Sequence, residues 1–175
     1  MQKSLENSNF VVFLLKNYEN NIINIMKFLK EKKYRTCHIL LRTPYEYFVS
    51  DLKENHMFSN DFYFVDVLSS HYKIPEKNHQ CVFLDYPHIN TILEATKNHI
   101  ETNKCNVVLF DSISSLLKYH RRFEIQKLTN ELKNLTLKKS KIVFLMPKQE
   151  ELSILESENL LKDLKLYADT IKELF

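Results

Sequence analysis

The acidic residue whose position most favours a chemical role is Asp111. It follows a run of four apolar residues at 107–110 and precedes Ser112. An unbroken β-branched and aromatic run of this kind predicts a strand buried on both faces, in the middle of a parallel sheet. Ligands of such sheets bind outside the carboxyl ends of the strands, so Asp111 and Ser112 are candidate ligand-binding residues. We favour a simpler interpretation, in which Asp111 caps backbone groups of Ser114 or Ser115.

Two further acids, Asp66 and Asp85, stand at or near the ends of other apolar runs. Neighbouring strands lie about 4.8 Å apart, so two of the three carboxylates could share a divalent cation. Asp111 and Asp85 are the candidate metal ligands. The favoured alternative is structural: Asp85 and Asp111 cap turns, and Asp66 lies within its strand.

Three cations, Lys16, Arg42 and Lys148, follow other predicted strands. The carboxyl ends of parallel strands meet at one edge of a sheet, so these side chains could converge with Asp111 on a phosphate group. The chain would then be a nucleotide- or phosphate-binding enzyme with a rebuilt site, and ATP with Mg²⁺ would be its cofactor. No cofactor is expected otherwise.

Nothing in the sequence indicates a catalytic residue or a zinc site. Ser112 lacks the G-x-S-x-G context of a nucleophile elbow. Four histidines expected in loops or at helix starts lack zinc-ligand spacing and are interpreted as surface residues: His71, His79, His88 and His120. The three cysteines form no C-x-x-C pair and are expected to be buried, reduced thiols: Cys37, Cys81 and Cys105.

The segment 118–141 is basic, with eight Lys and Arg against two acids, whereas 148–175 has four Lys against seven acids. A basic helix is most often a solvated face, but it can also bind an acidic protein or nucleic acid. Its candidate anion- or partner-binding residues are Lys118, His120, Arg121 and Arg122. The opposite charges of the two segments also indicate self-association. The net charge of +3 is too small to favour nucleic acid by itself.

Apolar runs and amphipathic periodicities alternate along the chain. The runs predict strands at 10–15, 36–41, 61–68, 81–85, 107–111, 141–146 and 169–175. Thr43, Pro44 and Glu46 match a helix start, with Thr43 as the N-cap of a capping box. The order predicts a single α/β domain over 1–175, with three layers: a mostly parallel sheet of about seven strands and helices on both faces.

The sequence contains no glycine, although about a dozen would be usual for 175 residues. Loops that cradle phosphate need glycine for positive φ or for close approach of the backbone. Neither G-x-x-x-x-G-K-[ST] nor G-x-G-x-x-G occurs here. The polar N-terminus and the lack of an apolar run of 18 residues lead us to expect a cytoplasmic protein without membrane contact.

Several segments together resemble the RecA/KaiC-like ATPases. Residues 107–117 are similar to the family's Walker B strand: four apolar residues, Asp111, Ser112 and a small or apolar run. Residues 167–174 resemble its last helix-to-strand junction. Residues 10–29 stand where the phosphate-loop strand and helix belong, and 39–46 where the second strand and a Ser-Pro helix start belong. The resemblance spans nearly the whole chain. The chain is also similar to archaeal KaiC-like proteins that carry such a domain in shortened form.

The departures from this family decide the expected activity. Between Leu15 and Ile23, where the family has its phosphate loop, the chain has no glycine and no lysine followed by a hydroxyl residue. The family's catalytic acids align with Leu41 and Arg42. Of the hydrolytic residues only Asp111 remains, so we expect a degenerate, non-catalytic regulatory or assembly module that has lost ATP hydrolysis. The resemblance also implies that the region after Asp111 faces nucleic acid or a neighbouring subunit.

Overall fold

The computed structural model describes residues 1–71, 78–136, 140–148 and 154–174. Helices, strands and two 3₁₀ turns (η1 and η2) follow one another in this order: α1 (Gln2–Asn7), β1 (Phe10–Leu15), α2 (Tyr18–Glu31), β2 (Thr36–Leu40), α3 (Tyr45–Glu54), β3 (Phe62–Asp66), η1 (Ser69–His71), β4 (Cys81–Phe83), α4 (Ile89–Thr102), β5 (Val107–Asp111), η2 (Ile113–Lys118), α5 (Arg122–Thr136), β6 (Lys141–Pro147), α6 (Ile154–Leu164) and β7 (Thr170–Leu174).

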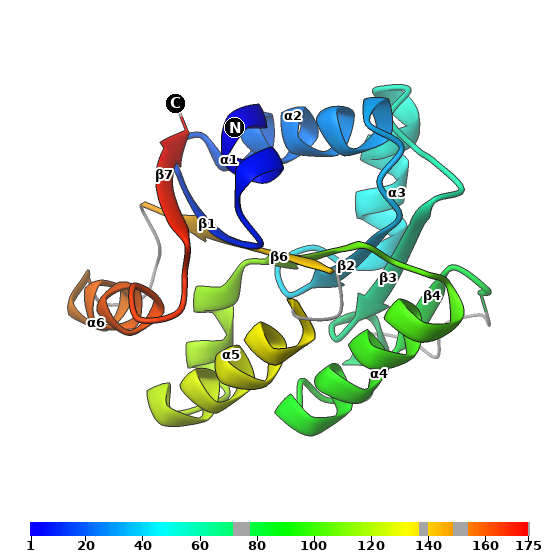
Figure 1. Ribbon diagram of the computed structural model, residues 1–175. Helices are drawn as coiled ribbons and strands as arrows, with labels where there is room; N and C mark the ends of the chain where they lie inside the picture. Colours follow the sequence, from blue (N-terminus) through cyan, green and yellow to red (C-terminus); the bar gives the residue numbers. More distant parts are fainter. Residues whose placement is uncertain (72–77, 137–139, 149–153, 175) are drawn as a thin grey trace.

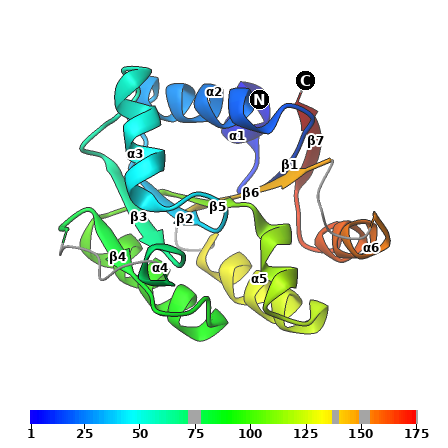
Figure 2. The same ribbon diagram turned by 180° about the vertical axis from the view of Figure 1, so that it is seen from behind.

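The seven strands form one sheet in the order β4-β3-β2-β5-β6-β1-β7, and every neighbouring pair is parallel. Helices α1, α2 and α3 cover one face, and α4, α5 and α6 cover the other (Figures 1 and 2). The predicted three-layer α/β architecture is therefore confirmed. Among the described residues no helix is long and apolar enough to cross a membrane.

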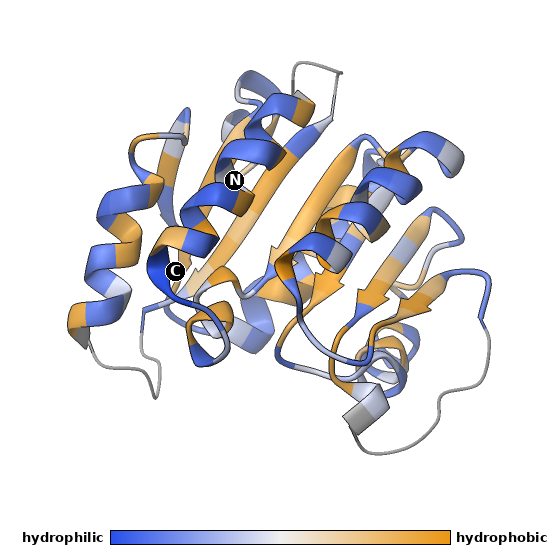
Figure 3. Cartoon of the chain, turned by 90° about the horizontal axis from the view of Figure 1, so that it is seen from below, coloured by the Kyte–Doolittle hydropathy of each residue, from blue (hydrophilic) through white to orange (hydrophobic). Residues whose placement is uncertain are grey.

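The core consists of two layers because the central strands bury both of their faces. β5 is buried at all five positions, and alternate residues contribute to opposite layers, Val108 and Phe110 to one and Val107 and Leu109 to the other. The strands are mostly hydrophobic, whereas the helices carry hydrophilic residues as well (Figure 3). Double burial explains why these strands appear in the sequence as unbroken apolar runs.

Three elements were not predicted, namely the short helix α1 and the 3₁₀ turns η1 and η2. The N-terminal residues had been interpreted only as a polar segment, yet Leu5 of α1 is 1% exposed and packs into the layer of α2 and α3. A single apolar side chain among polar ones gives too weak a periodicity to predict a helix. Residues 69–71 after β3 form η1, and residues 72–77 lie outside the described residues.

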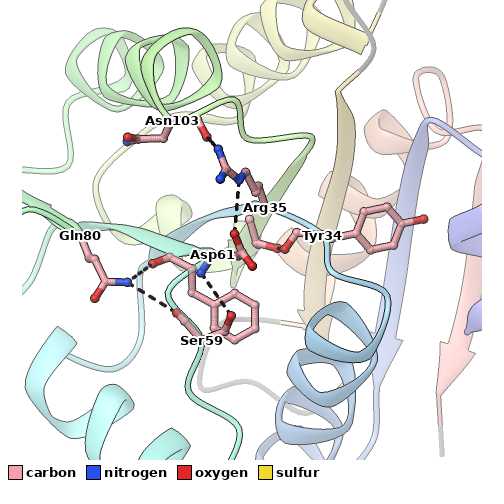
Figure 4. A network of polar contacts seen from close by, with 8 residues as sticks. Tyr34, Arg35, Ser59, Asp61, Gln80 and Asn103 are labelled. Carbon is pink, nitrogen blue, oxygen red and sulfur yellow. Dashed lines mark hydrogen bonds and ion pairs between the residues drawn. The ribbon is translucent and has the colours of Figure 1, made fainter.

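A polar network joins the segments that enter the sheet at its amino edge (Figure 4). The guanidinium of Arg35 donates to Asp61 Oδ1 and to the backbone carbonyl of Asn103, both at 3.3 Å. The Gln80 amide donates to the carbonyl of Phe62 at 3.0 Å. These contacts tie together the connections that precede β2, β3, β4 and β5. The candidate site lies at the opposite, carboxyl edge of the sheet.

The lack of glycine is visible at the ends of three helices. Lys33, His56 and Lys104 follow the C-caps of α2, α3 and α4 with φ values of 54°, 57° and 56°. This left-handed conformation is usually taken by glycine because a Cβ atom is strained there. The amides of Tyr34 and Met57 donate back to the Leu29 and Leu52 carbonyls, so α2 and α3 end in Schellman-type turns.

Replacing Lys33 with glycine is expected to stabilise the protein by about 0.5–1 kcal/mol, because it removes the strain of a left-handed residue that bears a Cβ atom. Urea unfolding followed by circular dichroism measures the change. The matched control is Lys32→Gly at the neighbouring position, where φ is −83°; there glycine brings only flexibility and should destabilise. Equal effects at 32 and 33 would contradict this explanation.

Candidate functional site

The connection between β1 and α2 is very short. Only Lys16 and Asn17 separate the last residue of β1 from Tyr18, the first residue of α2. The Asn17 carbonyl accepts the Asn21 backbone amide at 3.1 Å and the Asn21 side-chain amide at 2.7 Å. The chain thus passes from strand to helix with no concave loop in which backbone N–H groups could surround a phosphate.

A cavity of about 640 Å³ lies beside this connection, between α2 and α3 and next to the ends of β2 and β5. Its apolar and aromatic lining residues are Tyr18, Ile22, Ile23 and Phe48. Its polar lining residues are Glu19, Asn20, Asn24, Arg42, Thr43, Asp51, Asn55 and Asp111. The volume falls within the range of about 300–1,000 Å³ that is typical of small-molecule sites.

Arg42 and Tyr18 form one side of the cavity. The guanidinium carbon of Arg42 lies 4.4 Å from the centroid of the Tyr18 ring, in a cation–π contact. Arg42 follows β2 and Tyr18 follows β1, and β5 and β6 lie between these strands in the sheet. The two side chains therefore meet beyond the ends of β5 and β6, and their contact links α2 to the β2–α3 connection.

Asp111 is the last residue of β5, pairs with Leu40 of β2, and is 1% exposed. Its Oδ2 atom lies 3.6 Å from Nε2 of His38, and the residue lines the cavity. The peptide bond between Asp111 and Ser112 is cis. The amide of Ser115 donates to the Ser112 carbonyl at 3.0 Å, so a backbone turn holds an amide that we had expected the Asp111 carboxylate to cap.

His38 lies behind Asp111 and is completely buried. Its ring makes edge contacts with Phe48, at 4.7 Å between centroids, and lies 6.1 Å from Phe64. Within the described part of the chain neither ring nitrogen has a hydrogen-bond partner. Burial lowers the pKa of His38 from 6.5 to about 3, so the imidazole is neutral near pH 7 and gives Asp111 no positive counter-charge.

Asp66 lies within its strand, as we expected, and has in addition a capping role that we did not predict. It ends β3, is fully buried, and accepts hydrogen bonds from the amides of Tyr45, Leu68 and Ser69 and from the Ser69 hydroxyl. The bond from Tyr45 caps the N-terminus of α3. The predicted N-cap at Thr43 is wrong: Pro44 occupies the N-cap position, and the cap is supplied by this acid from a different strand.

The sheet order argues against a metal shared by Asp85 and Asp111. Asp85 follows β4 and is exposed, whereas Asp111 ends β5, and β3 and β2 separate the two strands. Three strand spacings amount to about 14 Å, too far for two carboxylates to hold one cation. In the ranges that the structure describes, no group of three or more His, Cys, Asp and Glu residues could hold a metal ion.

The candidate phosphate ligands do not all meet. Arg42 and Asp111 line the same cavity, whereas Lys16, Lys148 and Ser112 are not among its lining residues. The Lys148 ammonium forms an ion pair with Glu173 of β7 and thereby lowers the pKa of that carboxyl. Ser112 is buried, and its hydroxyl lies 2.7 Å from that of Ser114.

At least two of the four residues proposed as an anion-binding surface have partners within the chain. Arg122 of α5 forms an ion pair with Asp163 of α6, at 2.6 Å between Nε and Oδ2. His120 Nε2 lies 2.7 Å from the Pro87 carbonyl oxygen, and the ring is largely covered. Lys118 and Arg121 are exposed. The basic and acidic segments thus lie side by side, and part of their opposite charge is matched internally.

Other predictions concern histidines and cysteines. His79 and His88 are exposed as expected, and the side chain of His71 lies outside the described residues. The three cysteines are buried and free, which confirms the prediction of reduced thiols.

The sequence interpretation missed His38 and Tyr18 as neighbours of the site. Strand alternation could have placed His38 on the same face as Leu40, but the pairing of β2 with β5 was not available from the sequence.

Acid is expected to destabilise the protein through His38. Its pKa is about 3 in the folded chain and 6.5 ordinarily, so below about pH 6.5 the unfolded chain binds a proton that the folded chain does not. The free energy of unfolding should fall by up to about 1.4 kcal/mol per pH unit between these values. In His38→Phe, urea unfolding between pH 8 and pH 4 should show a shallower decline.

A part of the decline should remain in this variant, because burial also lowers the pKa of His99. The control is His79→Gln, which removes an exposed imidazole. If His38→Phe and His79→Gln leave the same pH dependence as the unaltered chain, His38 does not carry the effect.

Comparison with known proteins supports the fold but not a closer relationship. No family model matches the chain, and no curated protein matches it. Among solved structures, a KaiC-like protein from the hyperthermophilic archaeon Pyrococcus horikoshii superimposes with a TM-score of 0.54 and 14% identity, covering 95% of this chain and 72% of the archaeal one. At this identity the likeness concerns the fold alone. Together with the seven-stranded parallel sheet, it shows that the chain has a RecA-like α/β fold.

Proposed function

We propose that this chain is a RecA/KaiC-like domain that has lost ATP hydrolysis and serves as a non-catalytic regulatory or assembly module. The observation that carries the proposal is the passage from β1 to α2 through Lys16 and Asn17 alone. Phosphoryl transfer depends on positioning the phosphates and neutralising their charge. A two-residue connection without glycine supplies neither the loop nor the backbone donors for this.

The residues after β2 support the same proposal. Leu41 is 5% exposed and packs in the core, and Arg42 is held against Tyr18. Neither side chain can take a proton from an attacking water in the way that a carboxylate does. Asp111 therefore remains without the groups that would make it part of a hydrolytic site.

The alternative is a rebuilt phosphate site that uses Asp111, Arg42, Lys16 and Lys148. Only the first two of these line the cavity, and Lys148 is engaged with Glu173. A single guanidinium beside several carboxylates is a poor environment for a nucleotide phosphate. For this reason we prefer the non-catalytic function, in which ATP and Mg²⁺ have no part.

Isothermal titration calorimetry with ATP and Mg²⁺ tests the loss of nucleotide binding. No saturable heat is expected up to millimolar ATP, because the β1–α2 connection offers no phosphate cradle. No phosphate should be released in a parallel hydrolysis assay. A protein with an intact glycine-rich phosphate loop is the positive control. Saturable binding that requires Mg²⁺ would overturn the proposal, and its loss in Asp111→Ala would favour the rebuilt site.

A partner surface is the second part of the proposal. The exposed side of α5 carries Lys127, and Arg121 directly precedes this helix, whereas α6 is rich in acids. We propose that exposed charges such as those of Lys127 and Arg121 act between molecules, either between copies of this chain or with an acidic protein. Nucleic acid is the less favoured partner, since at least two of the four predicted anion ligands, His120 and Arg122, have partners within the chain.

Self-association should depend on salt. Light scattering is expected to show a larger mass at about 50 mM than at about 500 mM salt, because exposed charges are screened at the higher concentration. Lys127→Glu on α5 should weaken the association, whereas Lys97→Glu on α4, outside the basic segment, should not. A monomer at both salt concentrations would contradict self-association, and a mobility shift with an oligonucleotide that disappears as salt rises would favour nucleic acid instead.

A further inference from the structure

Two large apolar side chains are exposed next to the ion pair that joins α5 to α6. Phe123 of α5 is 61% exposed, and Leu166, in the turn that follows α6, is 76% exposed. Phe123 directly follows Arg122 in the chain, and the Leu166 amide donates to the Asp163 carbonyl at 3.1 Å. Arg122 and Asp163 are paired at 2.6 Å, so both apolar residues belong to the surface around this pair.

Positive charge predominates in the same two segments. Residues 121–124 and 162–166 contain four Lys and Arg against two acids. Glu124, the first acid, accepts a hydrogen bond from the Arg121 backbone amide at 2.9 Å, and Asp163, the second, pairs with Arg122. The other three cations of these segments are exposed: Arg121, Lys162 and Lys165. We call these three cations, together with Phe123 and Leu166, the α5–α6 patch.

The composition of the α5–α6 patch indicates the kind of partner that it fits. Apolar side chains beside charged ones are the usual anatomy of a protein interface, in which the apolar residues form the centre and the charged residues the rim. Lysine and arginine also extend the apolar area, because their methylene groups can lie along it while the charge stays in water. The complementary surface carries apolar residues flanked by carboxylates. A second copy of the same patch, related by a twofold axis, would bring like charges together.

We infer that the α5–α6 patch binds an acidic amphipathic helix of a partner protein. The apolar stripe of this helix covers Phe123 and Leu166, and the carboxylates beside the stripe meet the exposed cations of the patch. The inference rests on the non-catalytic function proposed above and specifies the acidic protein partner named there. It places the contact at the start of α5 and the end of α6, away from the β1–α2 connection.

Fluorescence anisotropy with a labelled helical peptide tests the patch. The peptide consists of Ala, Glu and Leu, with Leu three and four positions apart, and has about 18 residues so that its helix is stable. Saturable binding to the unaltered chain is expected at about 50 mM salt. Phe123→Ser and Leu166→Ser should each weaken it about fivefold or more, because each removes an apolar contact at the centre. Lys162→Glu should have a similar effect, because it places a like charge against the peptide.

The matched controls lie on the other face of the sheet. They are Tyr47→Ser on α3, which is 70% exposed, and Lys27→Glu, an exposed position on α2. Thermal unfolding of every variant checks that it is folded. Control variants that weaken binding as much as the patch variants would refute the site, and so would the absence of saturable binding. A peptide with Ser in place of Leu should bind at least about fivefold more weakly; equal affinity would show that charge alone is recognised and would also refute the site.

Other occupants of the patch give different results. If light scattering without peptide shows a dimer that Phe123→Ser dissociates, the patch binds a second copy and the inference is overturned. It is also overturned if vesicles of phosphatidylcholine and phosphatidylserine bind through Phe123 and Leu166 while the peptide does not bind. None of these results bears on the loss of ATP hydrolysis, which the titration with ATP and Mg²⁺ tests separately at the β1–α2 connection.

Discussion

Burial of both faces of the central strands is the constraint on which the rest of this structure depends. A strand covered on both sides by helices has no polar face, so β5 and β6 are apolar along nearly their whole length. Parallel neighbours must then be joined by crossover connections, which usually contain a helix, and all carboxyl ends meet at one edge. That edge is where the first polar residues appear, and Asp66 and Asp111 stand there with their side chains withdrawn from solvent.

Asp66 and Asp111 both stand at the end of a strand, but their surroundings differ. Asp66 accepts bonds from three backbone amides and one hydroxyl, and it fixes the start of α3. Asp111 lies two strands away from Asp66, on the other side of Leu40. It faces a neutral histidine and lines a cavity. The first acid is part of the scaffold. The second lies where small molecules bind in open parallel sheets, and its role depends on what enters the cavity.

The lack of glycine affects the backbone at the carboxyl edge of the sheet and at the C-terminal ends of α2, α3 and α4. No glycine is present to form a wide loop of exposed N–H groups after β1, and the helix begins after only two residues. This places Tyr18 where its ring can meet Arg42 from the end of β2. At the opposite ends of the helices, Lys33, His56 and Lys104 adopt the left-handed conformation and carry its cost.

The sequence by itself determined the order of strands and helices. A strand buried on both faces appears as an unbroken apolar run, and a helix buried on one face appears as apolar residues three and four positions apart. It also determined that no glycine-rich phosphate loop can form. Tertiary structure alone decided which strands are neighbours. It separated Asp85 from Asp111, brought His38 beside Asp111, replaced Thr43 by Asp66 as the cap of α3, and paired Arg122 with Asp163. Each of these contacts joins residues far apart in the chain. The sequence positions of these residues follow no regular spacing, so only the packing of the sheet and its two helical layers could reveal the contacts.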